Sequence, residues 1–134
     1  MTMNFKYRLV KRPGNNKVRT PSIPIIIENK IKTLALIDSG ADMPLISKNF
    51  AEILGIDMNK NISNSYGISG KIDSIESKIN ITINKGNENY NFDIPIKIIL
   101  SDYDFPVLLG RFSFFDEFII SFNQNKERVS LKKI

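Results

Sequence analysis

Two stretches of alternating residues constrain the fold of this chain more strongly than any other feature. In residues 79–83 isoleucine alternates with polar residues, and after a polar turn at 85–87 apolar residues alternate again from Tyr90 to Ile98. Successive side chains of a strand point to opposite faces, so this period of two predicts an antiparallel hairpin with one buried face. A chain organised around such a hairpin is expected to be mainly β.

Three other stretches predict further strands. Residues 23–37 contain two isoleucine-rich runs around a polar turn, which predicts a second hairpin. The run 107–109 is entirely apolar and ends at Gly110, which predicts a short buried strand. Residues 118–122 and 128–131, separated by a polar turn, predict a closing hairpin.

Two short helices are expected to accompany these strands. Ser47 is a suitable N-cap for residues 48–54, whose apolar side chains have helical spacing, and Gly55 follows where this helix should end. Residues 111–118 are the second helical candidate. The predicted fold class is therefore all-β with two short helices.

The length and the charge distribution bear on domain organisation and partners. A chain of 134 residues fits one domain. Residues 1–33 carry eight lysines and arginines against one acidic residue, Glu28. We expect residues 1–22 to be a basic, partly ordered N-terminal segment that begins with a short strand, and residues 23–134 to be the folded domain. A basic block can attract nucleic acid, but a solvated tail or strand face is commoner, so nucleic acid is not expected as a partner.

The absence of cysteine and histidine excludes several chemistries. It removes a disulfide framework, a thiol nucleophile, a Ser-His-Asp arrangement and the commonest transition-metal ligand. Carboxylates and lysines remain for acid–base work, and no cofactor or metal site is expected. Asp102 and Asp104, just before Phe105 and Pro106, fit a loop better than a cation site. No apolar run is long enough to span a membrane, so no membrane contact is expected and a cytoplasmic location is favoured.

An acidic residue follows directly after one of the predicted buried strands. The apolar run 34–37 leads into Asp38, Ser39, Gly40, Ala41 and Asp42. An unpaired carboxylate at such a position costs stability, so a fold that keeps one there usually gives it hydrogen bonds or uses it. Gly40 lets the backbone turn closely and present its amide to the Asp38 carboxylate, and the Ser39 hydroxyl can anchor the loop. A plain Asp-Ser-Gly turn without chemistry is the structural alternative.

The order of these motifs resembles the retropepsin-like aspartic proteases of the cellular and microbial type. In that family a hydrophobic strand leads into Asp-Ser/Thr-Gly-Ala, as it does here at residues 38–41. Residues 107–111 are similar to the family's second apolar strand, its glycine and the start of its C-terminal helix, and residues 66–70 fall where the flap tip should be. The resemblance covers residues 23–131. It implies a closed β-barrel or sandwich with two short helices and one half-site per chain.

The resemblance implies a homodimeric aspartic endopeptidase. The chain holds one Asp-Ser-Gly, so a second copy must complete the half-site. Two Asp38 carboxylates, one from each subunit, would share one proton. The ionised carboxylate would take a proton from a water that attacks the peptide carbonyl, and the protonated one would donate to the carbonyl oxygen. The implied partners are a peptide or protein substrate and a second copy of the chain.

The resemblance also implies roles for residues around Asp38. Ser39 would hydrogen-bond across the dimer beneath the two carboxylates, and Gly40 would set the loop and approach the substrate. Asp42 would pair with Arg111, the residue after Gly110, and brace the active-site loop that includes Ala41. Two unrelated surface charges are the alternative for that pair. The residues implied to contact the substrate are Leu36, Gly67, Ile68, Ser69 and Leu108.

Two other functions fit the same sequence. A non-catalytic dimer of this fold would bind peptides or scaffold a partner, and turnover of a peptide distinguishes an enzyme from it. A nucleic-acid-binding module built on the basic N-terminal segment would lose affinity steeply as the salt concentration rises.

Overall fold

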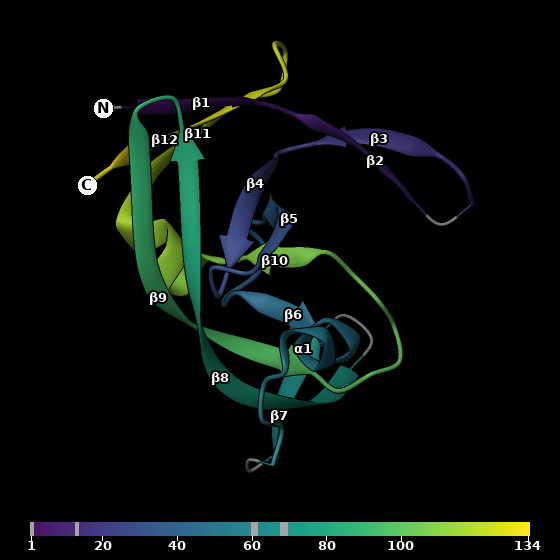
Figure 1. Ribbon diagram of the computed structural model, residues 1–134. Coiled ribbons are helices and arrows are strands. Elements are labelled where there is room, and N and C mark those ends of the chain that lie inside the picture. Colours follow the sequence, from purple (N-terminus) through teal and green to yellow (C-terminus); the bar gives the residue numbers. More distant parts are fainter. Residues whose placement is uncertain (1, 13, 60–61, 68–69) are drawn as a thin grey trace.

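The computed structural model describes residues 2–12, 14–59, 62–67 and 70–134, and a closed β-barrel forms its centre (Figure 1). The barrel strands are β4 (Ser22–Ile27), β5 (Ile31–Ile37), β10 (Val107–Leu109), β6 (Leu45–Ser47), β9 (Glu88–Ile99) and β8 (Gly70–Lys85). In the described part of the chain they are hydrogen-bonded in that order, and a pairing of β4 with β8 closes the ring. A further strand, β7 (Ile62–Gly67), pairs with β8 alone. The predicted all-β class and the barrel are confirmed.

The long hairpin predicted from the alternating residues is the β8–β9 pair. Its register places Ile79 opposite Ile94 and Ile81 opposite Phe92. The polar residues between them face outward, where the Asn80 side-chain amide donates to the Asp93 carboxylate at 2.9 Å. Isoleucine packs well on a pleated surface, so strand propensity and burial favour the same structure here. The barrel core consists largely of Ile23, Ile25, Ile27, Ile46, Ile75, Ile79, Ile81, Ile83, Ile94, Ile96 and Ile98.

The first predicted helix is confirmed as α1 (Lys48–Leu54). The Ser47 hydroxyl accepts a hydrogen bond from the backbone N–H of Phe50 at 3.2 Å, which caps the start of the helix. Gly55 ends it with φ of 74°, a left-handed conformation that glycine adopts without strain. Among the described residues, no helix has both the length and the apolar character that a membrane crossing would need.

The second predicted helical segment is present but less regular than predicted. Its first part is a wide helical turn, η1 (Arg111–Phe115), helical structure continues through Asp116 and Glu117, and strand β11 (Phe118–Asn123) begins at Phe118. Ser113 has φ of 73°, which interrupts the helical backbone. Its backbone N–H bonds the Asp116 carboxylate at 2.9 Å, and such a local side-chain bond competes with helical hydrogen bonding.

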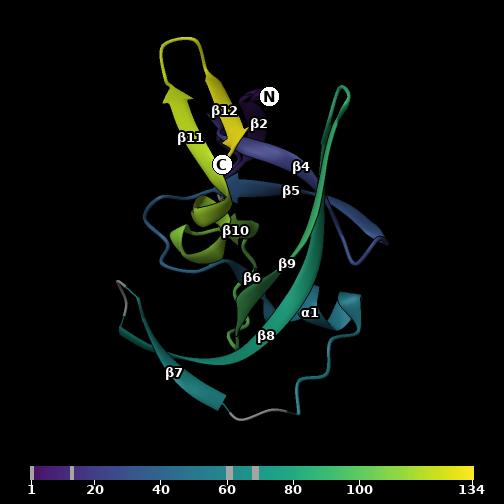
Figure 2. The same ribbon diagram turned by 90° about the vertical axis from the view of Figure 1, so that its left-hand side faces the viewer.

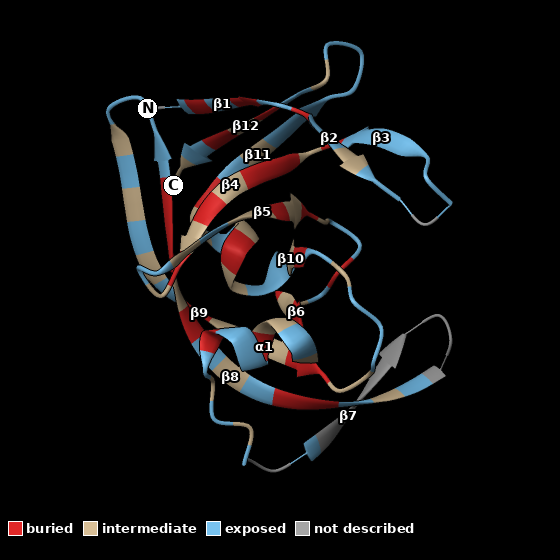
Figure 3. Cartoon of the chain, turned by 45° about the vertical axis from the view of Figure 1, so that its right-hand side comes forward, coloured by how far each residue is buried: buried red, intermediate tan, exposed pale blue. Residues whose placement is uncertain are grey.

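A small sheet joins the two ends of the described chain. Strand β1 (Thr2–Lys6) pairs with β12 (Arg128–Lys133), and β12 pairs on its other side with β11, so the predicted closing hairpin is confirmed. The ends marked N and C lie close to each other in Figure 1. Met3 and Phe5 are buried in the same core as the barrel isoleucines, and burial along β1 alternates strictly (Figure 3).

The basic N-terminal segment holds more strand structure than the sequence indicated. In addition to β1, strands β2 (Arg8–Lys11) and β3 (Lys17–Thr20) form a hairpin that projects away from the barrel (Figure 1). Most side chains of this hairpin are exposed. Because the hairpin has no buried apolar face, no alternating pattern in the sequence could reveal it.

Phe114 offers a direct test of this packing. Its side chain is fully buried, and its ring centroid lies 5.4 Å from that of Phe118 and 6.4 Å from that of Phe92. We predict that Phe114→Ala lowers the free energy of unfolding by about 3–5 kcal/mol, because the cavity cannot fully collapse. Tyr103→Ala, at an exposed aromatic residue, should change it by less than about 0.5 kcal/mol. Urea denaturation measures both, and similar values for the two variants would contradict the packing described.

Candidate active site

Asp38 lies directly after β5, where the ends of two barrel strands are joined. Strands β5 and β10 run parallel, with Ile37 opposite Leu109. The backbone N–H of Asp38 donates to the carbonyl oxygen of Leu109 at 3.1 Å, one residue beyond the paired strand. This bond fixes the point at which the chain leaves the barrel, and therefore fixes the origin of the Asp38 side chain.

Asp38 is a half-buried residue, and its carboxylate is held by the turn that follows it. The backbone N–H of Gly40 donates to its Oδ1 at 2.9 Å, as the sequence predicts, and the N–H of Ala41 donates to the Asp38 carbonyl at 3.2 Å. No other side-chain hydrogen bond to this carboxylate is made within the described residues. One carboxylate oxygen is thus positioned by the backbone, and the other accepts no hydrogen bond from the part of the chain that the structure describes. Ser39 is exposed.

Arg111 connects the loop after Asp38 to the segment after β10. Its guanidinium donates to the Asp42 carboxylate, so the predicted pair forms, although both side chains are more than half exposed. An exposed ion pair contributes little on its own. Two backbone bonds carry more of the connection, because the N–H of Arg111 donates to the Ala41 carbonyl at 2.9 Å and the N–H of Phe112 donates to the Asp42 carbonyl at 2.7 Å.

Gly110 allows the close approach on which these bonds depend. A Cβ atom added at this position would collide with the carbonyl group of Met43 and would lie 2.8 Å from the carbonyl oxygen of Ala41. The neighbouring atoms belong to backbone and cannot rotate away. A side chain at residue 110 would therefore push the loop away from β10.

A row of half-exposed leucines lies beside Asp38. Leu36 on β5 is opposite Leu108 on β10, and Leu108 is opposite Leu45 on β6. All three are partly exposed, whereas their neighbours along each strand are mostly buried. Leu36 and Leu108 were predicted to contact substrate. Leu45 was not predicted, because only the pairing of β6 with β10 brings it next to Leu108, and a three-residue strand leaves no alternating pattern to read.

The hairpin predicted around residues 66–70 is present as the β7–β8 pair. Its backbone register places Gly67 opposite Gly70. Ile68 and Ser69, the other two residues predicted to contact substrate there, lie outside the described residues. In Figure 2 the adjoining ends of β7 and β8 lie on the same side of the molecule as the loop of residues 38–44.

Gly110 gives a test of the loop geometry. We predict that Gly110→Ala lowers the free energy of unfolding by about 1–3 kcal/mol, because the added methyl group must displace the backbone at Met43. Since φ at this residue is −85°, an ordinary value for alanine, backbone strain would not explain the loss. Thermal and urea unfolding measure the effect, and an unchanged stability would show that the loop does not approach β10 this closely.

Three solved structures are similar to this chain along most of its length. A retropepsin-like aspartic protease from Rickettsia conorii is 19% identical with a TM-score of 0.62, and the match covers 98% of this chain and 91% of that one. The retroviral protease-like domain of Ddi1 from Leishmania major is 15% identical with a TM-score of 0.55, covering 88% and 96%. The EIAV protease, complexed with the inhibitor HBY-793, is 19% identical with a TM-score of 0.51, covering 80% and 93%.

Comparison by sequence gives no match, either to a family model or to a curated protein. The likeness therefore lies in the arrangement of the backbone. It includes the barrel, the segment after β10 and the terminal hairpin, since the match to the Rickettsia protein covers nearly the whole chain. This chain has the fold of the retropepsin-like aspartic proteases.

Proposed function

We propose that this protein is an aspartic endopeptidase that acts as a homodimer, with one Asp38 carboxylate from each copy. The observation that carries the proposal is the position of Asp38, a half-buried residue at the end of a core strand with one carboxylate oxygen held by the Gly40 amide. An aspartate in an ordinary surface turn does not require a hydrogen bond from its backbone N–H to Leu109, nor one from Arg111 to the loop that follows it. The similar structures from Rickettsia conorii and EIAV, which are described as proteases, support the same reading.

A second copy is needed because one chain supplies half of the required groups. Hydrolysis by carboxylates needs one ionised group and one protonated group on the same substrate. The sequence contains one Asp-Ser-Gly, and Asp73, which is followed by Ser74 and Ile75, lacks the glycine. Asp73 also lies within β8, paired with Asn64 on β7, rather than at a strand end. The second carboxylate must therefore come from another molecule.

The two carboxylates would act on a water molecule placed between them. The ionised Asp38 takes a proton from the water as its oxygen attacks the peptide carbonyl carbon, and the protonated Asp38 of the other copy donates to the carbonyl oxygen. As this tetrahedral intermediate collapses, the Asp38 that donated its proton takes one back from a hydroxyl group of the intermediate, the C–N bond breaks, and the proton taken from the water passes from the first Asp38 to the leaving nitrogen. The leucine row beside Asp38 provides an apolar surface for side chains next to the cleaved bond, and closure of the β7–β8 hairpin would exclude water.

Strand β11 provides a surface on which two copies could meet. It pairs with β12 on one side, and no described strand pairs with its other edge. Its sequence, Phe-Ile-Ile-Ser-Phe-Asn, has no charge and no proline, the two features that usually protect an exposed edge. Ile119 and Phe122 on this strand, and Phe112 just before it, are exposed large apolar residues. In Figure 2, β11 lies on the same side as the loop of residues 38–44, so pairing about a two-fold axis there is compatible with facing carboxylates.

The first prediction of this proposal concerns Asp38. Asp38→Asn should abolish cleavage of unfolded protein substrates, with a loss of at least about 10³-fold, because the amide can neither take the proton nor share it. The variant should unfold at nearly the same temperature as the wild type. Asp102→Asn, at an exposed aspartate in the loop between β9 and β10, is the matched control and should keep full activity.

Mass spectrometry of the peptides released over time measures this cleavage. Wild-type activity retained by Asp38→Asn would exclude the mechanism. A wild-type protein that binds peptides but never cleaves them, at any concentration, would favour the non-catalytic dimer.

The second prediction concerns the β11 edge. Ile119 is 56% exposed, so Ile119→Glu should leave the fold intact, but it would place two like charges near each other across a two-fold axis. We expect sedimentation to shift from dimer to monomer and activity to fall with it. Ile53→Glu, at a residue of α1 that is 63% exposed, is the control and should leave both unchanged. A monomeric Ile119→Glu variant with full activity would contradict the two-copy site.

A further inference from the structure

The pairing register brings positive charges face to face near the N-terminus. Lys6 on β1 is directly opposite Arg128 on β12, and Lys11 on β2 is directly opposite Lys17 on β3. Residues directly opposite in an antiparallel pair are close neighbours, and like charges in that position destabilise a sheet. The chain therefore keeps two repulsive pairs within one short region.

The rest of the described sheet structure arranges its charges differently. Where two charged residues are directly opposite on β8 and β9, their signs are complementary, as in Glu76 with Lys97 and Lys85 with Glu88. The repulsive pairs are thus confined to the N-terminal strands and to β12, on which β1 pairs. Because the like-charge pairs occur together in this one region, we expect its surface to bind an anion that is not part of the chain.

The first pair lies in a groove that contains more positive charge. A cavity of about 600 Å³, here called the basic groove, is lined by Asn4, Phe5, Lys6, Tyr7, Arg8, Pro24, Asn84, Lys85, Gly86 and Arg128. Its lining has four cationic side chains and no acidic one. None of the four forms a salt bridge with a carboxylate in the described part of the chain. Lys85 is directly opposite Glu88, but Lys6, Arg8 and Arg128 have no acidic residue opposite them in the register, and such uncompensated positive charge in a concave site attracts anions.

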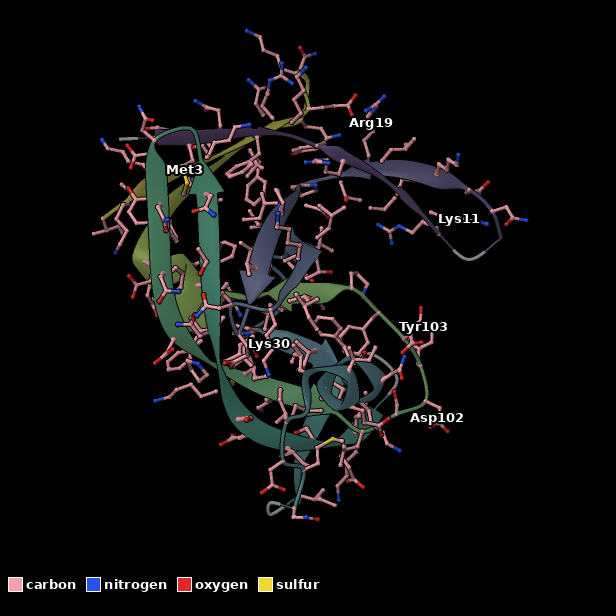
Figure 4. All side chains as sticks on the ribbon, viewed as in Figure 1. Met3, Lys11, Arg19, Lys30, Asp102 and Tyr103 are labelled. Atoms are coloured by element: carbon pink, nitrogen blue, oxygen red, sulfur yellow. The ribbon has the colours of Figure 1, made fainter. Side chains whose placement is uncertain are left out.

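The second pair lies on the projecting hairpin, which is continuous with the groove. The hairpin formed by β2 and β3, here called the basic arm, begins at Arg8, a residue that also lines the groove. Lys11 follows about 10 Å farther along the strand, and because it is three residues on, it lies with Lys17 on the face of the hairpin opposite to Arg8. Figure 3 shows most of the arm as exposed, and Figure 4 shows Lys11 and Arg19 at well-separated points along it. Arg19 has a partner in Glu127, at 3.6 Å.

We propose that the basic groove and the basic arm together bind the phosphate backbone of nucleic acid without reading its sequence. A single small anion would occupy the groove but could not also reach Lys11 and Lys17, whereas nucleic acid presents phosphates at short, regular intervals along its whole length and can pass over the edge of the arm. Sequence analysis led to the opposite expectation, because a basic stretch alone is usually a solvated face. The like-charge register, visible in the structure alone, is the reason for the revision.

The composition of this surface favours nucleic acid over an acidic protein. Interfaces between proteins have an apolar core that is poor in lysine, whereas interfaces with DNA are more polar and strongly positive. Here the two aromatic residues of the groove, Phe5 and Tyr7, are buried, so no exposed ring is available for base stacking. Contact through phosphates alone makes binding independent of sequence and steeply dependent on salt.

Fluorescence anisotropy of a labelled DNA duplex of about 20 base pairs, titrated with the whole chain between about 50 and 200 mM NaCl, tests the proposal. We expect binding that weakens steeply with salt, with a Kd of about 1–100 µM at physiological salt. Lys6→Gln/Arg128→Gln and Lys11→Gln/Lys17→Gln should each bind more weakly and lower the slope of log K against log salt by about 2.

The control variant carries the same loss of charge elsewhere. Lys30→Gln/Lys78→Gln removes two exposed lysines outside the groove and the arm, and it should bind as the wild type does. Absence of binding at low salt, or equal slopes for the control and both site variants, overturns the proposal. Poly-glutamate that binds more tightly than the duplex, through the same lysines, overturns it in favour of an acidic protein partner.

A stability measurement separates binding from folding. Because Lys6 and Arg128 repel each other, Lys6→Gln/Arg128→Gln should unfold at the same temperature as the wild type, or at a higher one, in low salt. Weaker binding by this variant then reflects the lost charge and not a damaged fold. A lower unfolding temperature would mean that the pair stabilises the sheet, which would contradict the argument from repulsion.

Discussion

The parallel pairing of β5 with β10, at the point where both strands end, is the constraint on which the candidate site depends. Two strands far apart in the sequence lie parallel there, and the backbone bond from Asp38 to Leu109 extends their pairing by one step. The absence of a side chain at Gly110 then lets the following loop approach from the other side. Carboxylate position, loop shape and the link to Arg111 all follow from this contact between backbones. The exposed ion pair between Asp42 and Arg111 adds little to it.

Much of the fold could be predicted from sequence because local patterns decided it. The alternation through residues 79–98 and the Ser47 cap each act within a few residues, so they remain readable in one chain. Strands β2 and β3 could not be predicted, because their stability does not come from a buried face. The interruption in the helical segment after Gly110 could not be predicted either, because it consists in the left-handed backbone of Ser113.

The candidate site could be predicted in part for the same reason. Asp38 and its turn form one continuous stretch of sequence, and the amide of Gly40 reaches the carboxylate as local geometry requires. The place of Leu45 in the leucine row depends on how β6 pairs with β10. The close approach of the Met43 backbone to Gly110 depends on how the loop after Asp38 packs against the end of β10. Neither contact can be predicted from the residue type or from its neighbours in the sequence. Cross-strand register is therefore what the sequence alone did not supply, both at this site and at the basic surface.

The pairing of β1 with β12 has a consequence for how the molecule is made. A strand at the start of the chain finds its partner only when the last residues of the sheet are available, and contacts of such wide sequence separation slow folding. During synthesis on a ribosome, Met3 and Phe5 must therefore remain without their partners on β12 until residues 128–133 have emerged. The nascent chain would present the apolar face of this strand to its surroundings for the whole of that interval.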